Sequence, residues 1–315
     1  MCGQRELTSI MYTYAHIANT VVFNETGIVT NDTCAGIRVT GQGPFDLVID
    51  AMEPVVLQVI IDQQQASQFT LNYEVAANAS VRLVEVRHLH AQSQYQRHMQ
   101  IGQGAQVEMI LVNESDHQGE LTISETVHVA RDASLKAGYG ELADGNQNSQ
   151  YVYELDGEGA HVELSLAALA KEKDRKHFTV TLNHHAPNTY GNMENYGAVK
   201  DQARLVFDGV GRIERGMHLT STHQTSKIMV LDEGCIAKAN PYLYIDDYDV
   251  KASHAAGVGR MDDDHLYYLQ SRGLTKAQAM HLITYGYLLP AIAKMNDQEV
   301  ATRFEAMLEK KVGNA

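Results

Sequence analysis

Apolar and polar residues alternate along most of the chain, and one short phrase recurs within that alternation. Four segments read as a small turn residue, an alanine and then alternating positions: NASVRLV, GAQVEMILV, DASLKAGYG and GAHVELSLA, with their alanines at Ala79, Ala105, Ala133 and Ala160. These alanines follow one another at steps of 26, 28 and 27 residues. Alternation with a period of two predicts half-buried β-strands, and its return at a longer, nearly fixed period predicts a repeat architecture.

The length of the repeat favours a β-solenoid over other all-β folds. A β-sandwich or barrel also has short strands, but its turns come about every 8–12 residues and need not repeat a phrase at a longer period. A unit of about 27 residues holds three short strands and three turns, or one coil of a solenoid. We therefore predict a mainly β protein, a right-handed parallel β-helix over residues 1–260, with room for roughly nine coils between Val21 and Gly259.

The pattern changes to a helical one after this region. The acidic run DDDH suits a helix N-terminus, and Gly273 can end that helix. Thr275 and Gln278 have the spacing of a capping box, apolar residues then recur every three to four positions, and Pro290 should kink or interrupt the second helix. Residues 261–315 are thus predicted to form two or three helices, whose simplest role is to cap the solenoid.

Composition restricts the classes of partner. Lys and Arg number 25 and Asp and Glu number 39, which gives a formal net charge of −14. Such an acidic chain is a poor binder of nucleic acid, because that binding needs cationic side chains against phosphates; an anionic membrane surface is equally disfavoured. No apolar run approaches the roughly 18 residues of a spanning helix, and the first residues lack the layout of a signal peptide. We therefore expect a cytoplasmic protein that binds neither nucleic acid nor membranes.

Recognisable catalytic and metal-binding motifs are weak or missing. His88 and His90 would share one face of a strand, the geometry of a paired-histidine metal site, but with 15 histidines one such pair is expected by chance. His184 and His185 are adjacent, so they would point to opposite faces of a strand. The sequence contains no P-loop, no GxGxxG and no nucleophile elbow. It therefore predicts no nucleotide-hydrolysing site in this chain.

Cys235 and His254 remain as candidate functional residues. The three cysteines, Cys2, Cys34 and Cys235, form no CxxC pair and no disulfide framework. A lone cysteine is usually a small buried residue. His254 stands among small residues where the strand-like pattern ends. The two residues are 19 positions apart, less than one coil, so spacing alone does not stack them.

The segment DVKASHAAGVGRMDDDHLYYLQSRGLTKAQAMHLITYGY (249–287) resembles the SufB/SufD family of the SUF iron–sulfur cluster assembly system and is most like SufD. It shares a Lys-x-Ser-His followed by small residues, a Val-Gly-Arg with an acidic turn, and a Tyr-Leu-x-Ser-Arg-Gly-Leu. The resemblance is clear over about residues 183–295 and looser through the solenoid. It implies a right-handed β-helix followed by C-terminal helices, in agreement with the repeat, and a non-enzymatic scaffold for cluster assembly.

The resemblance also implies partners. In this family SufB, SufC and SufD form a complex on which a cluster is built, with sulfur supplied indirectly by a cysteine desulfurase system. A SufB-like subunit, or a second copy of this chain, is expected to pair with it. A SufC-type ABC ATPase is expected to dock on the helical region 261–315, at Tyr267, Leu269, Arg272, Leu282 and Tyr285.

The site that the resemblance implies lies at a subunit interface. His254 matches the SufD histidine that faces SufB, and Cys235, six residues before Pro241, is placed like the scaffold cysteine of SufB. Iron or a transient iron–sulfur cluster is therefore expected at Cys235 and His254, with no stably bound cofactor. A chain that carries both residues could be a minimal version that works as a homodimer.

Departures from the family leave alternatives open. Ala252, Ala255 and Gly257 stand where SufD proteins often have other residues, and the usual N-terminal helical region is expected to be absent, because strand-like repeats begin within the first 40 residues. One alternative is a purely structural member that binds the ATPase without cluster chemistry. Another is a catalytic, carbohydrate-active β-helix, which needs carboxylates on one face, such as those of the run YIDDYD (244–249), and a secretion signal that is missing.

Overall fold

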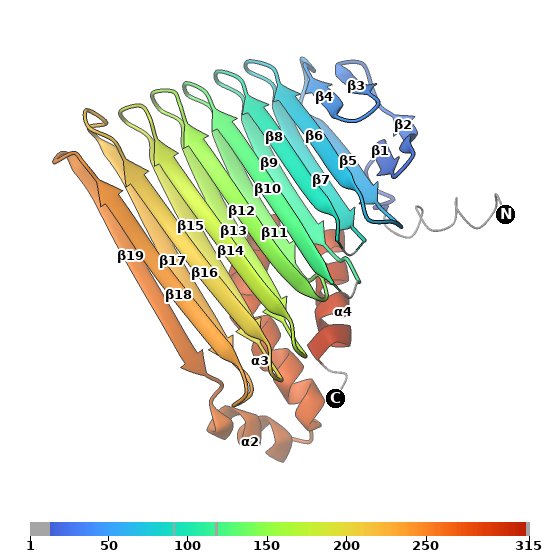
Figure 1. The fold of residues 1–315 in the computed structure, drawn as a ribbon, viewed down its shortest axis with the longest axis vertical. Helices are drawn as coiled ribbons and strands as arrows, with labels where there is room; N and C mark the ends of the chain where they lie inside the picture. The colour runs from blue at the N-terminus through green and yellow to red at the C-terminus, as the bar shows by residue number, and fades with distance from the viewer. Residues whose placement is uncertain (1–12, 91, 117–118, 313–315) are drawn as a thin grey trace.

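The computed structural model describes residues 13–90, 92–116 and 119–312. Successive strands alternate between two sheets, which together wind into a β-solenoid (Figure 1). From β4 onward the odd-numbered strands belong to a ten-stranded sheet, here sheet A, and the even-numbered strands to a nine-stranded sheet, here sheet B. This arrangement confirms the predicted mainly β solenoid followed by helices. Cys2 and the start of the chain, for which no signal peptide is predicted, lie outside the described residues.

Sheet A contains β19 (Val250–Arg260), β17 (Thr220–Val230), β15 (Tyr190–Val199), β13 (His161–Ala170), β11 (Ser134–Glu141), β9 (Gln106–Asn113), β7 (Ser80–His88), β5 (Val55–Asp62), β1 (Asn19–Asn24) and β2 (Gly27–Asp32), in this order. Sheet B contains β18 (Ile236–Ile245), β16 (Arg204–Ile213), β14 (Arg175–His184), β12 (Asn146–Leu155), β10 (Glu120–Val129), β8 (Gln94–Ile101), β6 (Gln68–Val75), β4 (Phe45–Ile49) and β3 (Ile37–Gly41). All these neighbours are parallel except the pairs β1–β2 and β3–β4, which are antiparallel and cover the N-terminal end.

Each coil contains two long strands rather than three short ones, and the number of coils is smaller than predicted. The strands from β5 to β19 are 8 to 11 residues long. The coils also grow along the chain: Val55 pairs with Val81, 26 residues on, whereas Tyr190 pairs with Ser221, 31 residues on. Because longer coils use up the chain sooner, the solenoid makes about seven turns and not nine.

The repeated phrase marks one turn position in each coil. The residue before each repeated alanine has a positive φ; these residues are Asn78, Gly104, Asp132 and Gly159. Gly, Asn and Asp adopt this left-handed conformation at the least cost, and the alanine that follows is buried in the stack. Asn188 and Leu219 continue the same turn with positive φ. The turn therefore persists in the later coils, where the alanine phrase is no longer visible.

Three helices follow the solenoid: α2 (Asp263–Ser271), α3 (Lys276–Ile292) and α4 (Gln298–Val312), with a 3-10 turn, η1 (Ala293–Met295), before the last. The predicted signals act as expected. Gly273 follows α2 with a φ of 98°, and Thr275 and Gln278 form a reciprocal capping box at the start of α3. Pro290 lies in the last turn of α3, and the chain tightens into η1 directly after that helix.

α3 and α4 cover the outer face of sheet A rather than the end of the solenoid, so the predicted capping role is wrong for these two helices. α3 packs against β11, β13 and β15, and α3 and α4 lie behind the strands in Figure 1. Their buried side chains form a second hydrophobic cluster with the outward residues of sheet A. Ion pairs fasten the last helix as well, including Lys311 with Asp144 at 2.6 Å and Arg303 with Glu114.

Candidate functional site

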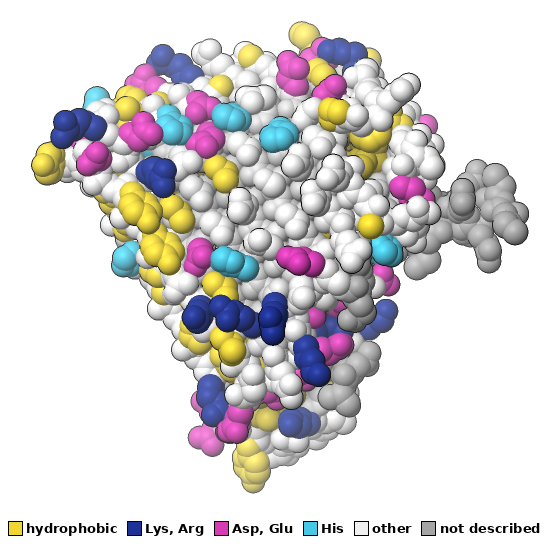
Figure 2. All heavy atoms as spheres, viewed as in Figure 1, with side chains coloured by type: hydrophobic (Ala, Val, Ile, Leu, Met, Phe, Trp, Pro, Cys, Tyr) yellow, Lys and Arg dark blue, Asp and Glu magenta, His cyan; other side chains and the backbone are white. Residues whose placement is uncertain are grey.

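The last coil of the solenoid ends in two open edge strands. β19 ends sheet A and β18 ends sheet B, and within the described part of the chain each pairs on one side only. Every residue of β19 after Val250 is exposed. Large apolar side chains of these two strands are exposed too, namely Ile236, Tyr242, Tyr244, Ile245 and Val258. Hydrophobic side chains gather on this side of the molecule in Figure 2. Such an edge is a template for pairing with another chain.

His254 lies on the inward side of β19. We call the space between the inner faces of the two sheets the lumen; side chains fill it. Register pairs His254 with Gln224 of β17, which is buried in the lumen at 3% exposed. The adjacent pair faces outward, since Ser253 Oγ lies 2.7 Å from Nδ1 of the half-buried His223. Because side chains alternate along a strand, the His254 imidazole stands over the lumen at its open end.

Cys235 lies at one end of the last coil, in the turn before β18. Its Sγ is 3.6 Å from the carbonyl oxygen of Asp201, and the residue is partly buried against the main core. Glu233, in the same turn, pairs with Arg260 at the far end of β19 at 3.2 Å. His254 lies six positions before Arg260 along this extended strand, a distance of roughly 20 Å. The structure therefore does not bring Cys235 and His254 together within one chain.

The surroundings of Cys235 disfavour its thiolate, which is the reactive form of the side chain. Burial raises the pKa of the Cys235 thiol, and the neighbouring carboxylates of Asp232 and Asp201 act in the same direction. The thiolate is the nucleophile and the metal ligand. In the isolated chain this sulfur is therefore held as a protonated thiol.

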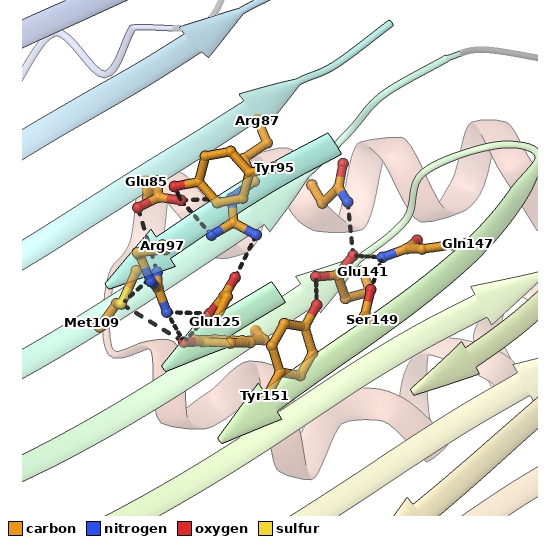
Figure 3. Close-up of polar contacts among 12 residues, drawn as sticks. Glu85, Arg87, Tyr95, Arg97, Met109, Glu125, Glu141, Gln147, Ser149 and Tyr151 are labelled. Carbon is orange, nitrogen blue, oxygen red and sulfur yellow. Dashed lines mark hydrogen bonds and ion pairs between the residues drawn. The ribbon is translucent and has the colours of Figure 1, made fainter. Parts of the chain in front are cut away.

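The lumen nearer the N-terminal end contains a buried ion-pair cluster that sequence reasoning missed (Figure 3). Glu85 and Arg87 of β7, Arg97 of β8 and Glu125 of β10 are each at most 1% exposed. Arg87 pairs with Glu85 at 2.5 Å and with Glu125 at 2.6 Å, and Arg97 contacts both carboxylates. Two positive and two negative charges balance one another, which offsets the cost of burying them.

The arginines set the ionisation of this cluster. Burial alone raises the pKa of the Glu85 carboxyl, but Arg87 and Arg97 outweigh it and lower that pKa below its usual range. Hydrogen bonding continues one coil further, where Glu141 accepts from the Tyr151 hydroxyl at 2.5 Å. These groups are tied to one another across two sheets and several coils. The cluster therefore links β7, β8 and β10 through side chains that already pair with one another.

The residues predicted to face the ATPase are of two kinds. Tyr267 and Leu282 are 74% and 49% exposed, and Arg272 is exposed at the end of α2. Leu269 and Tyr285 are partly buried, and Tyr285 packs against the second hydrophobic cluster. A docking test therefore changes Tyr267 or Leu282, since Tyr285 also supports the fold.

The paired histidines of the sequence do not assemble a metal site. His88 lies between two carboxylates, with Nδ1 3.2 Å from Asp62 and Nε2 2.9 Å from Asp116. Burial lowers the pKa of His88, but the two carboxylates outweigh it and raise that pKa. His90 follows the strand and is exposed. Within residues 13–90, 92–116 and 119–312, no three His, Cys, Asp or Glu side chains gather as a metal-binding group.

Two further sequence features have structural roles. His184 is buried and its neighbour His185 is not, as opposite faces predict. The acidic run after β18 shapes a turn: Asp247 accepts the backbone N–H of Gly216 at 2.8 Å and of Asp249 at 3.0 Å. In the part of the chain that the structure describes, no helix has the length and apolar character to cross a membrane.

Comparison of the sequence with known protein families gives a match to one of them. Residues 58–287 match the sequence model of the family described as SUF system FeS cluster assembly, SufBD core domain. This stretch contains most of the solenoid, the open end and α2. The chain belongs to the SufBD core family. The resemblance seen in the segment 249–287 is thereby confirmed, and the open end with His254 lies inside the shared core.

Individual relatives point to the SufD side of the family. The chain is 34% identical over 182 residues to the iron-sulfur cluster assembly protein SufD of Bacillus subtilis, which covers 58% of this chain and 42% of that protein. A SufBD family protein of Mycobacterium tuberculosis is 31% identical over 161 residues, covering 49% and 41% of the two chains. Another from the same organism is 28% identical over 180 residues, covering 56% and 21%. The matches thus cover less than half of each relative.

Proposed function

We propose that this chain is a SufD-like, non-enzymatic scaffold subunit on which iron or a nascent iron–sulfur cluster is handled at the open end of the solenoid. Membership of the SufBD core family supports the assembly role. The observation that carries the proposal is the position of His254, which stands over the lumen on a strand that lacks a neighbour on its outer side among the described residues. A residue there is within reach of a second subunit.

Pairing through the last coil follows from the edge strands. β18 and β19 carry free backbone groups together with exposed Tyr242 and Val258, a combination that favours strand addition by another chain. Ala255 and Gly257 beside His254 allow a second backbone to approach closely. The partner is a SufB-like subunit or a second copy of this chain.

The chemistry at the open end is ligation of iron as cargo. A neutral imidazole can bind iron, and thiolates are the preferred ligands of iron–sulfur clusters. Cys235 is too far from His254 in its own chain, so it can join the same site only across the subunit interface. Sulfur arrives from a cysteine desulfurase system, with no cluster held stably by this chain alone.

The energy for opening the interface comes from a partner. The chain has no nucleotide-binding motif, whereas α2 and α3 present exposed Tyr267 and Leu282. We place a SufC-type ABC ATPase on these helices. When ATP draws two attached ATPase subunits together, the helices between residues 267 and 285 are strained, and the paired open ends separate.

Size-exclusion chromatography with light scattering tests the docking and the pairing. Wild-type chain, alone and mixed with the SufC-type ATPase of the same organism, is compared with Leu282→Asp and with the control Met52→Asp, whose side chain is 99% exposed on the other end of the molecule. We expect Leu282→Asp to weaken ATPase binding at least tenfold, by removing an apolar contact and adding a charge. Met52→Asp should bind like wild type.

The masses distinguish the arrangements. A complex of two chains and two ATPase subunits supports self-pairing, and one chain with one ATPase indicates that a SufB-like subunit completes the site. Failure of the wild-type chain to bind the ATPase, or equal binding by Leu282→Asp, contradicts the proposed dock.

A structural member without cluster chemistry is the second candidate. The altered neighbours Ala252, Ala255 and Gly257 favour it. Such a protein binds the ATPase normally but supports no cluster, so reconstitution separates the two. A carbohydrate-active enzyme gains no support, because the carboxylate run that it needs holds a turn through Asp247.

A further inference from the structure

Basic side chains form a row on the outer face of sheet B, near the start of its last three strands. They are Arg175 of β14, Arg204 of β16 and Lys238 of β18, here called the basic row, and all three are exposed. Register places Arg175 beside Arg204, and Lys238 lies two positions beyond Ile236, the residue beside Arg204 on the other side. A row of Lys and Arg side chains is visible on this face in Figure 2. Because neighbouring strands are about 4.8 Å apart, the three charges share one small patch.

The basic row has no counter-charge on its own face. Among the described residues, none of its three cations forms an ion pair with a carboxylate. The structure describes β14, β16 and β18 in full, and Asp208 is the only carboxylate at their outward positions. Asp208 is already engaged, since it lies 2.7 Å from Nε2 of His177 and accepts from Nδ2 of Asn240 at 2.8 Å. The charges of the row are therefore left to the solvent or to a partner.

The position of the two arginines is unfavourable for the fold itself. Arg175 and Arg204 lie directly opposite one another on neighbouring strands, where like charges destabilise a sheet. Elsewhere the solenoid places opposite charges in this relation: Arg82 of β7 lies beside Glu108 of β9, and the two form an ion pair at 2.7 Å. The chain has 39 acidic and 25 basic residues, so carboxylates are not scarce. An uncompensated basic row in such a chain is typical of a surface that attracts an anionic partner.

Apolar side chains accompany the basic row and narrow the class of partner. Ile236, in register with Arg204, is 48% exposed, and Tyr242, further along the outer face of β18, is 41% exposed. Arginine next to exposed apolar and aromatic side chains is typical of protein–protein interfaces. We propose that the basic row binds an acidic segment of a partner protein. Its carboxylates pair with the guanidinium groups of Arg175 and Arg204, which suit bidentate contacts, and an apolar side chain covers Ile236.

This surface is separate from the contacts already described. The free edge of β18 presents backbone groups in the plane of the sheet, whereas Ile236 and Lys238 project from its outer face. α3 packs on β11, β13 and β15 of sheet A, on the other side of the solenoid. The acidic segment can therefore bind while the open end is paired and the helices are occupied. The inference does not depend on iron or cluster handling.

Fluorescence anisotropy tests the proposal with a short labelled peptide rich in glutamate and leucine, titrated with the full chain at low salt. We expect saturable binding that weakens as salt is added, because salt screens exposed charges. Arg204→Glu should weaken binding roughly tenfold or more. Arg212→Glu is the matched control, because Arg212 is exposed on the same face of the same strand but roughly 25 Å further along it. It should bind within about twofold of wild type.

The stability of the same variant separates partner binding from a structural role. A glutamate at position 204 faces Arg175 as an opposite charge, which favours the pairing of β14 with β16. We therefore expect Arg204→Glu to unfold at a urea concentration no lower than wild type while its binding of the peptide is lost. A variant that loses stability along with binding would show that Arg204 supports the fold, and this would contradict the proposal.

The remaining outcomes also decide the question. The proposal is overturned if the wild-type chain does not bind the glutamate-rich peptide, if Arg204→Glu and Arg212→Glu bind it alike, or if a peptide with glutamine in place of glutamate binds equally well. Binding of single-stranded oligothymidylate in place of the peptide would indicate a nucleic-acid surface. Dimerisation of the wild-type chain that Arg204→Glu abolishes would identify a second copy as the occupant. Either result contradicts an acidic partner segment.

Discussion

Single charged residues buried in the lumen are expected to have large effects on the stability of the fold. Glu125 is 1% exposed and contacts both Arg87 and Arg97. Removing one member of such a cluster leaves an arginine charge that is buried without compensation, and this costs far more than loss of an exposed pair.

Glu125→Gln is expected to lower the free energy of unfolding by about 3 kcal/mol or more. The matched control is Glu108→Gln. Glu108 forms an ion pair with Arg82 at the surface, where its side chain is 52% exposed. Loss of this pair should change the free energy of unfolding by no more than about 1 kcal/mol. Urea unfolding followed by circular dichroism measures both. Equal effects of the two substitutions would show that the lumen cluster does not stabilise the fold.

The sequence could not reveal these residues because their burial depends on distant partners. Glu85 and Arg87 are two positions apart in SVRLVEVRH, on the face that Leu83 occupies, and this is the one available signal. Their partners Arg97 and Glu125 come from other coils. Likewise the inward direction of His254 depends on its register with β17, which the small residues of its own strand do not specify.

At the scale of elements, α4 is held at its start by a histidine from the beginning of the described chain. His16 contacts Asp297 through Nε2 at 3.0 Å and Glu299 through Nδ1 at 2.5 Å. The hydrogen bond to Asp297, followed by that to Glu299, raises the pKa of His16 above its ordinary value. The protonated imidazole therefore bridges two carboxylates that would otherwise repel each other.

The stability that His16 contributes should depend on pH with a definite sign. A raised folded-state pKa means that the contribution is fully present below about pH 6.5, the ordinary histidine value, and is lost as pH rises through the folded-state pKa. Because His16 is 44% exposed, solvent limits the effect to about 1 kcal/mol or less. The difference in unfolding free energy between wild type and His16→Gln should be largest near pH 6 and vanish by pH 9.

Hydrogen exchange in α4 locates this effect, because protection should fall first in the turn that contains Glu299. His128→Gln is a control at the surface of sheet B, where a single carboxylate, Asp156, lies 2.7 Å away. A wild-type minus His16→Gln difference that stays constant or grows with pH would contradict the bridge.

Prediction of the elements succeeded where local signals decide them. Gly273, the capping box and Pro290 mark helix ends through their own backbone preferences. The exposed face of α3 was less predictable: of the apolar residues near its middle, Leu288 is buried and Leu289 is 41% exposed. Which side is covered depends on how the helix sits on sheet A, and this is not a property of the helix alone.

For the whole molecule, the repeated phrase was enough to predict a solenoid because each coil needs the same turn and the same buried alanine. It did not give the number of coils, since the later coils are longer and their turns use Asn188 and Leu219 instead. It also did not place α3 and α4, which cover the outer face of sheet A and leave the edges of β18 and β19 uncovered.

In the function that we propose, the open end of the solenoid handles iron or a cluster through His254. The most direct measurement is anaerobic reconstitution of an iron–sulfur cluster on the purified complex of this chain with its SufC-type ATPase and SufB-like partner, followed by visible absorption. We predict that His254→Ala abolishes cluster formation while the complex stays assembled, and that the control His223→Ala retains it. Cys235→Ser reports whether this cysteine takes part in cluster formation. Undiminished cluster formation by an assembled His254→Ala complex would contradict the account.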